Sequence, residues 1–217
     1  MRRGAAKGDI MRKVWFITGA SRGFGRIWAE AALSRGDQVA ATARTLADVT
    51  NTEQARHAVV QAHAHFGRID VVLNNFGRID VVLNNAGYTF VGTIEEASEA
   101  DVHALFETNF FGTLRVIQAA LPLLRQQGSG HILSVSSGLG SSVPLIGFYC
   151  ASKWATESLH DSLSQEVKGF GIKGTLIEPG AYATEFASPD FSCSTVRISN
   201  SSFTKIRRAR GQVAHNQ

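Results

Sequence analysis

The chain has 217 residues, of which 44% are hydrophobic and 18% charged, with 21 Gly, 4 Pro and 2 Cys. This composition is typical of one folded domain with a buried core, and it excludes a disordered, collagenous or disulfide-based protein. No run approaches the roughly 18 consecutive apolar residues of a membrane span, and no apolar segment follows the basic start. We therefore expect a cytoplasmic protein without a membrane partner.

The positive charge is concentrated at the two ends of the chain. Residues 1–13 hold five Lys or Arg and one Asp, and residues 197–217 hold five Lys or Arg and no acid, although the net charge is only +4. The part between them is net acidic, which argues against nucleic acid as a partner, because nucleic-acid-binding domains carry basic residues on a folded face. We expect a disordered tail over 1–12, a folded domain over 13–187 and a poorly ordered tail over 188–217.

Apolar strands and helical segments alternate along the folded part. A strand that begins at Lys13 runs into Gly19, a helix over 26–35 ends at Gly36, and a second strand covers 38–43. The pattern continues with helices over 52–65, 99–125 and 149–169 and strands over 79–83, 131–136 and 173–177. It predicts an α/β fold with a doubly wound parallel sheet in three α/β/α layers.

Two features interrupt this alternation. The decapeptide FGRIDVVLNN occurs twice without change, over 66–75 and 76–85, and a period of ten is too short for a solenoid repeat. Only the second copy leads directly into the following helix, so we interpret it as the strand and the first as an extruded loop or helix extension. Only residues 44–47 separate the second strand from Asp48, too few for a crossover to a third parallel strand.

A glycine-rich turn lies between the first strand and the first helix, where the chain reads Thr18-Gly19-Ala-Ser-Arg-Gly23-Phe-Gly25. At this position glycines let the backbone approach a pyrophosphate, and the helix N-terminus supplies amide donors. Glycine also serves any tight strand-to-helix turn, so this motif alone leaves a purely structural role open.

A tyrosine and a lysine at four-residue spacing give a stronger chemical signal. Tyr149 and Lys153 of YCASK lie on one face of a predicted helix. A nearby ammonium favours phenolate, so it lowers the pKa of a tyrosine towards the working pH of a general acid/base. Ser136 and Ser137 end a predicted strand, at the sheet edge where open α/β folds bind ligands.

The remaining polar candidates point to no other chemistry. His57, His63 and His65 share a predicted helix without a carboxylate to complete a ligand set, so we expect no metal. The adjacent pair His160-Asp161 comes without the G-x-S-x-G turn of a hydrolase, so a catalytic triad is not expected.

Taken in order, TGASRGFG, NNAG, Asn109, Ser137, YCASK and Glu178-Pro179-Gly180 followed by Thr184 resemble the short-chain dehydrogenase/reductase family over about 13–186. The resemblance implies a Rossmann-type domain that binds NAD or NADP and interconverts an alcohol and a ketone or aldehyde by hydride transfer. The implied substrate is a small alcohol or carbonyl compound.

The resemblance also implies the roles of four catalytic residues. Tyr149 would donate or accept the proton, Lys153 would lower its pKa and hold the nicotinamide ribose, Ser137 would orient the carbonyl, and Asn109 would support a water relay to Lys153. The family's serine more often lies 13 residues before the tyrosine, which here is Ser136. The local Ser-x-x-Gly pattern favours Ser137 instead.

The cofactor contacts that the resemblance implies come from five segments: Gly19, Ser21, Arg22, Gly23, Phe24, Gly25, Arg44, Asp48, Val49, Asn85, Ala86, Gly87, Tyr149, Lys153, Pro179, Gly180 and Thr184. An acidic residue after the second strand would favour NAD, but here Arg44 follows it. Arg22 and Arg44 together can bracket a 2′-phosphate, so we expect NADP rather than NAD. The alternative for Arg44 is a solvated loop cation.

The chain departs from the family pattern in three places. The region after Arg44 is shortened, the decapeptide is duplicated, and the substrate-binding segment and last strand usual beyond Phe186 are not matched, so one or more of the usual strands should be missing. Two functions stay open. One is an NADP-dependent oxidoreductase that self-associates through the helices carrying Asn109 and Tyr149. The other is a catalytically inert, truncated remnant that at most binds nucleotide or pairs with related subunits.

Overall fold

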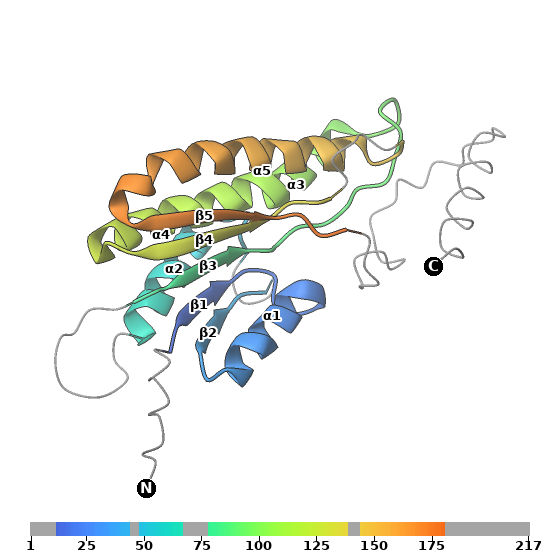
Figure 1. The fold of residues 1–217 in the computed structure, drawn as a ribbon. Coiled ribbons are helices and arrows are strands. Elements are labelled where there is room, and N and C mark those ends of the chain that lie inside the picture. The colour runs from blue at the N-terminus through green and yellow to red at the C-terminus, as the bar shows by residue number, and fades with distance from the viewer. Residues whose placement is uncertain (1–11, 44–47, 67–77, 139–143, 181–217) are drawn as a thin grey trace, which may run out of the picture.

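The computed structural model describes residues 12–43, 48–66, 78–138 and 144–180. Figure 1 shows the elements in chain order: β1 (Val14–Ile17), α1 (Gly23–Ser34), β2 (Gln38–Ala41), α2 (Thr52–Phe66), β3 (Val81–Asn84), α3 (Glu99–Phe106), the π-helical turn η1 (Glu107–Phe111), α4 (Gly112–Gln127), β4 (Gly130–Val135), α5 (Gly147–Glu166), the 3-10 turn η2 (Lys168–Phe170) and β5 (Ile172–Ile177).

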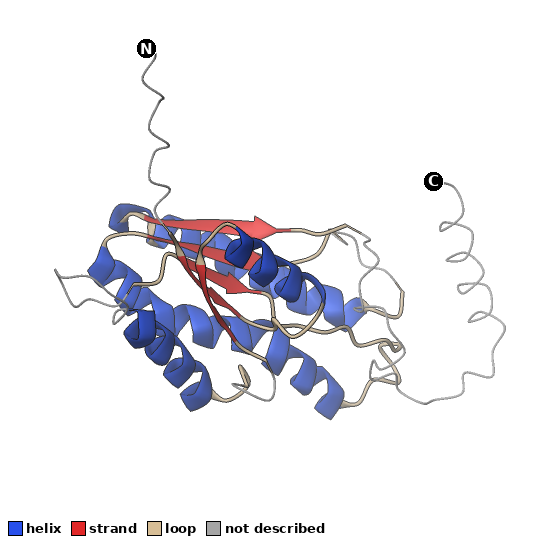
Figure 2. Cartoon of the chain, turned by 90° about the horizontal axis from the view of Figure 1, so that it is seen from below, coloured by secondary structure: helices blue, strands red, loops and turns tan. Residues whose placement is uncertain are grey.

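All five strands pair in parallel, in the order β2-β1-β3-β4-β5. The chain runs from β1 outward to β2 and then returns to β3 on the other side of β1. The carboxyl ends of β1 and β3 therefore flank the switch point where open α/β sheets bind ligands. Helices cover both faces of the sheet (Figure 2), which confirms the predicted doubly wound α/β fold.

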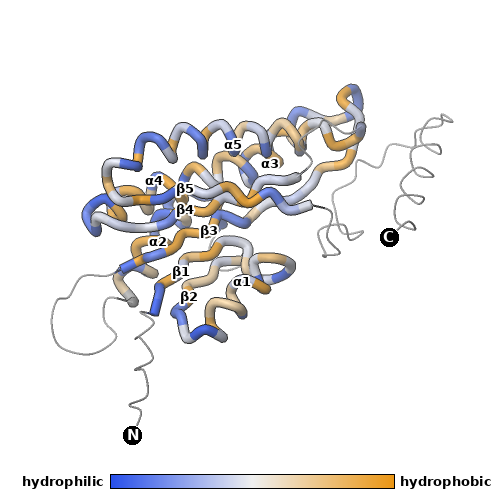
Figure 3. The backbone as a smooth tube through the Cα atoms, in the orientation of Figure 1, coloured by the Kyte–Doolittle hydropathy of each residue, from blue (hydrophilic) through white to orange (hydrophobic). Residues whose placement is uncertain are grey.

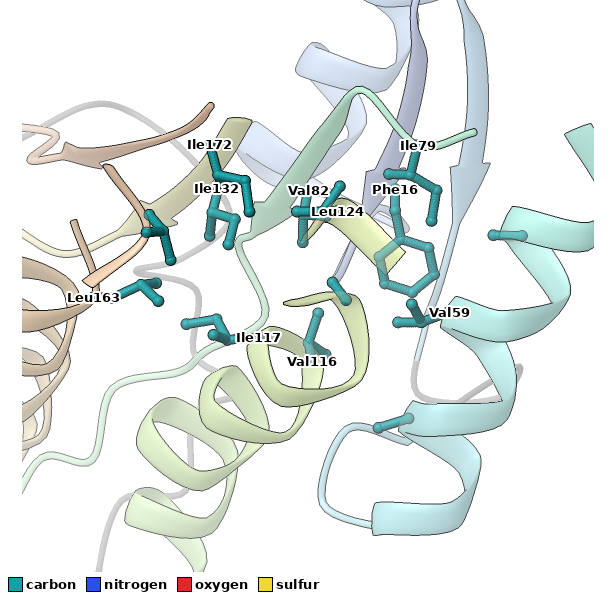
Figure 4. Close-up of a cluster of buried hydrophobic side chains, with 14 of the residues drawn as sticks. Phe16, Val59, Ile79, Val82, Val116, Ile117, Leu124, Ile132, Leu163 and Ile172 are labelled. Carbon is teal, nitrogen blue, oxygen red and sulfur yellow. The ribbon is translucent and has the colours of Figure 1, made fainter. Parts of the chain in front are cut away.

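The main core lies between the sheet and the layer formed by α2, α4 and α5 (Figure 4). Side chains from four strands meet side chains from these helices: Phe16, Val82, Ile132 and Ile172 from the sheet, with Val59, Val116, Ile117, Leu124 and Leu163 opposite. Figure 3 shows apolar stretches along the central strands β1 and β3, whereas polar stretches recur along the outer helices. Each such side chain stabilises the fold by about 1.5–3 kcal/mol when fully buried.

The second decapeptide copy forms β3, as predicted, although the strand covers Val81–Asn84 rather than 79–83. It is a central strand that pairs with both β1 and β4. Asp80 fixes its start, because its carboxylate accepts from the Val14 N–H at 2.8 Å and its carbonyl accepts from the His131 N–H at 2.9 Å. Phe66 ends α2, and residues 67–75 of the first copy lie outside the described residues.

The predicted helix over 99–125 is confirmed as one continuous run of helical residues, formed by α3, the π-helical turn η1 and α4, although the π-helical turn in its middle was not predicted. A π-helical turn inserts an extra residue into the helical register, often at a functional site. The predicted helix over 149–169 is confirmed only in part: α5 begins two residues earlier, at Gly147, and gives way to the 3-10 turn η2.

Within the described residues β2 has a neighbour on one side only, in keeping with the expected lack of a third strand next to it. None of the helices described is long and apolar enough to cross a membrane. The two predicted tails fall almost entirely outside the described residues.

Candidate active site

The turn after β1 is joined to the turn after β3 by Thr18 and Asn85. Thr18 Oγ1 accepts hydrogen bonds from the backbone N–H groups of Asn85 and Ala86, both at 3.0 Å. Asn85 Nδ2 donates to the carbonyl oxygens of Thr18 and Gly19 at 3.1 and 3.0 Å. Gly19 has a φ of +65°, and a Cβ there would come 2.9 Å from Ala86 Cα. The two turns therefore form one hydrogen-bonded unit at the switch point.

The beginning of α1 fits the phosphate of a nucleotide cofactor. Arg22 is the N-cap residue but makes no side-chain cap, and the first helical turn contains no acidic residue. Amide donors and the positive end of the helix dipole are thus left for an anion, with no negative side chain to oppose it. Ser21 and Arg22 are exposed beside this end, and Phe24 stacks on Trp28 with ring centroids 5.3 Å apart.

Asn109 lies in η1 and is fully buried. Its Oδ1 accepts from the Tyr88 N–H, and its Nδ2 donates to the Tyr88 carbonyl and to Ser152 Oγ, each at 3.0 Å. A Cβ on Gly87 would lie 3.1 Å from Asn109 Oδ1 and 3.3 Å from Lys153 Nζ. The structure therefore brings Asn109, Gly87 and Lys153 together, with the Asn109 side chain engaged by its neighbours.

Tyr149 and Lys153 reach the end of β4 from α5. Lys153 Nζ donates to the Val135 carbonyl at 2.8 Å and lies 5.8 Å from the centroid of the Tyr149 ring. The side chains of Ser137 and Tyr149 share a hydrogen bond. Of the two adjacent serines, it is Ser137 that contacts the tyrosine.

Ser136 has a different partner, because its hydroxyl donates to the carboxylate of Glu157. Glu157 follows Lys153 on α5 at the same four-residue spacing that separates Lys153 from Tyr149. Three consecutive residues at the end of β4 thus contact three successive positions on one face of α5.

Burial dominates the electrostatics of this site. Lys153 is only 5% exposed, and burial lowers the pKa of its ammonium to about 8, although the Glu157 carboxylate acts in the opposite direction. Tyr149 is 3% exposed, and burial raises its pKa, which the hydrogen bond with Ser137 partly offsets. The expected lowering of the tyrosine pKa is therefore not found, because desolvation outweighs the other influences and Lys153 points to the Val135 carbonyl.

The segment after β5 also reaches this edge of the sheet. The Pro179 carbonyl accepts a hydrogen bond from the Gly138 N–H at 2.9 Å, so Pro179 lies next to the residue that follows Ser137. Gly180 is exposed. Thr184 lies outside the described residues.

The residues predicted after β2 are not seen to join the site. The Asp48 carboxylate accepts from the Thr50 N–H at 2.9 Å, and Val49 is buried in the main core against Gly112 of α4. The first contact shapes the turn before α2, and the second packs this turn on α4. Arg44 lies outside the described residues, and no group of described residues could hold a metal ion.

Sequence reasoning missed three residues that organise the site. The sequence patterns place Thr18 only within the glycine-rich turn and do not single out Ser152 or Glu157. Glu157 continues the four-residue spacing of Tyr149 and Lys153, so periodicity offered a signal for it. Thr18 and Ser152 lie within the motifs TGASRGFG and YCASK, but these motifs do not show their partners, which come from distant elements.

Comparison with known proteins agrees with this geometry. Residues 13–192 match the family model described as short chain dehydrogenase. The chain belongs to the short-chain dehydrogenase family. It is therefore an oxidoreductase by family, with the nucleotide-binding Rossmann fold that the sheet order and the turn after β1 indicate.

Oxidoreductase BOA17 of Botryotinia fuckeliana is 42% identical over 207 residues, which cover 86% of this chain and 72% of the relative. A short-chain dehydrogenase of Streptomyces avermitilis has a similar structure, with a TM-score of 0.72 and 38% identity over 80% of this chain and 66% of its own. The structure of ElxO with NADP bound also has a TM-score of 0.72, with 27% identity over 84% of this chain and 81% of the ElxO chain. Three further curated relatives are matched over 56 to 65% of their length.

Proposed function

We propose that this chain is an NADP-dependent oxidoreductase that interconverts an alcohol and a ketone or aldehyde, with Tyr149 as the general acid/base. The observation that carries the proposal is the hydrogen bond between Ser137 and Tyr149 at the carboxyl edge of the sheet. Two hydroxyl groups from different elements converge there, so one carbonyl oxygen can accept hydrogen bonds from both.

The proposed chemistry divides between the cofactor and the side chains. NADPH, when bound, supplies the hydride. Tyr149 gives its proton to the carbonyl oxygen, and Ser137 donates a hydrogen bond to the same oxygen. The resulting phenolate is stabilised by Ser137 and by the nearby Lys153 ammonium. Asn109 holds Ser152 and the Tyr88 backbone beside Lys153, which supports a water relay for the returning proton.

Within the proposed catalytic domain, over 13–187, the expected cofactor contacts are those given by the family resemblance. The turn after β1 and the start of α1 would hold the pyrophosphate, and Asn85, Ala86, Gly87 and the segment after β5 the nicotinamide end. NADP is proposed over NAD because Arg22 is exposed at the start of α1 and Arg44 follows β2. ElxO, a related protein, binds NADP.

We also propose a cytoplasmic protein that self-associates through the helices carrying Asn109 and Tyr149. Phe111, which ends η1, and Trp154 on α5 are large apolar side chains that are exposed in one chain. Homodimer interfaces bury aromatic side chains of this kind.

Two measurements test the proposed function. NADPH added to the purified chain should receive energy from tryptophan fluorescence and should be oxidised when ketones and aldehydes are supplied. Tyr149→Phe should reduce turnover by a factor of about 10² to 10⁴ and leave the NADPH Kd within about twofold, because only the proton-transferring oxygen is removed. Failure to bind NADPH would favour the inert remnant, and equal turnover in the variant would reject Tyr149 as the acid/base.

A further inference from the structure

Glu157 is the third member of the row on α5 that begins with Tyr149 and Lys153. Its carboxylate accepts a hydrogen bond from Ser136, whose side chain is almost completely buried. Ser136 lies between Val135, whose carbonyl binds Lys153 at 2.8 Å, and Ser137, which contacts Tyr149. The carboxylate is therefore fixed to the same piece of backbone that holds the proposed catalytic groups.

The charges around Lys153 are few. Among the described residues, the titratable groups that face its ammonium are Tyr149 and Glu157, both on α5. The end of β4 contributes the neutral Val135 carbonyl, and η1 contributes the neutral Asn109 amide, which like Lys153 lies next to Gly87. The negative charge of Glu157 thus raises the pKa of this buried ammonium, which desolvation lowers.

We propose that Glu157, held by Ser136, is a positioning residue whose negative charge keeps the Lys153 ammonium charged at the end of β4. The consequence of this charge for catalysis rests on the proposed function, because Lys153 stabilises the Tyr149 phenolate when it is charged and not when it is neutral. Glu157 itself makes no contact with the reacting groups in this scheme. It acts through Lys153.

The protonation of Lys153 can be measured without cofactor or substrate. The chain has six lysines, so ¹³Cε-labelled lysine gives few NMR signals, and Lys153→Arg identifies the one from Lys153. In the unaltered protein this signal should titrate with a midpoint near the pKa of about 8. In Glu157→Gln the midpoint should move to lower pH by about one pH unit, because the carboxylate charge that favours the ammonium is lost.

Glu166→Gln is the matched control, since it removes the same charge from α5 at a position about 20 Å along the helix from Lys153. It should leave the Lys153 midpoint unchanged. In Ser136→Ala the Lys153 midpoint should also move to lower pH, but by less than in Glu157→Gln, because the Glu157 carboxylate is still present and has lost only its hydrogen bond from Ser136. If Glu157→Gln does not fold, Ser136→Ala and Glu157→Asp carry the test, with Glu157→Asp expected to keep most of the charge effect.

An unchanged midpoint in Glu157→Gln, or an equal movement in Glu166→Gln, would overturn the inference. In the active protein, the lower midpoint should reduce kcat/KM at pH 8 about fivefold relative to the unaltered protein, with recovery at lower pH. The NMR titration stands even if NADPH does not bind, so a failure of the proposed function and a failure of this inference are distinguishable.

Discussion

Gly25 of α1 packs directly against the backbone of Gly19, so a Cβ on Gly25 would come within 2.5 Å of Asn85 Nδ2 and still closer to the Gly19 carbonyl oxygen. One of these atoms is backbone, and the other belongs to the amide that bonds the carbonyls of Thr18 and Gly19. Neither can move without breaking the unit that joins the turn after β1 to the turn after β3.

Gly25→Ala should therefore lower the free energy of unfolding by about 1–3 kcal/mol, the usual cost of inserting a methyl group into a packed site, and should weaken NADPH binding. Urea denaturation and a fluorescence titration measure the two effects. Gly169→Ala is the control, because a Cβ at Gly169 meets nothing within 4 Å. Equal stability of both variants would mean that the turn tolerates a side chain.

The order of elements could be predicted from the sequence because local patterns encode it. Buried strands such as β3 are short apolar runs, and Gly36 and Gly128 end helices α1 and α4 within two residues. The π-helical turn η1 within the long helix could not be predicted. It coincides with the contacts of Asn109 with Tyr88 and Ser152, which depend on residues far away in the chain.

The candidate site was predictable as a set of residues but not as a set of contacts. Four-residue spacing places Tyr149 and Lys153 on one face of α5, yet it does not say that Lys153 binds the Val135 carbonyl. The raised pKa of Tyr149 follows from burial, which the spacing cannot show. The pairing of Ser136 with Glu157 likewise depends on how α5 packs on β4.

His160 of α5 makes the fold sensitive to acid. It is 2% exposed, its Nδ1 lies 3.1 Å from Ser134 Oγ, and its Nε2 has no hydrogen-bond partner among the described residues. Burial lowers the pKa of His160, a direction that Asp161 opposes and His131 reinforces. The unfolded state therefore binds a proton more readily, and stability is lost as pH falls below about 6.5.

The pH dependence of unfolding tests this sign. Between pH 7 and 5 the free energy of unfolding should fall, and His160→Gln should make that fall shallower, whatever its effect on stability at pH 7. His103→Gln is the control, because the His103 side chain is 77% exposed. If the slope is the same in His160→Gln as in the unaltered protein, His160 does not titrate on unfolding.

Arg44 is predicted to select the phosphorylated cofactor. In Arg44→Asp the ratio of kcat/KM for NADPH over NADH should fall by at least about tenfold, because a carboxylate repels the 2′-phosphate and accepts a hydrogen bond from a free 2′-hydroxyl. Arg56→Asp, an exposed site on α2, provides a control for the change of charge. An unaltered ratio in Arg44→Asp would remove Arg44 from the cofactor site.

Deletion of residues 66–75 should stabilise the protein. The deletion leaves one intact copy of the decapeptide, and that copy supplies β3 with its partners on both sides. The sheet has no vacancy beside β3 for the same sequence twice. Ile69, Val71, Val72 and Leu73 would forgo about 1.5–3 kcal/mol each of burial and form a β-prone segment. The deletion should raise Tm and reduce aggregation, measured by thermal unfolding and light scattering.

The repeat also provides an internal control, because Val72 and Val82 occupy the same position in the two copies. Val82 is completely buried in the core between β1 and β4, so Val82→Asp should abolish folding by burying an unpaired carboxylate. Val72→Asp should leave Tm within about 2 °C and lower aggregation, since the charge interrupts the same β-prone segment without reaching the core. The opposite result, with Val72→Asp unfolding the protein, would mean that the first copy is the structural strand and that β3 has been assigned to the wrong repeat.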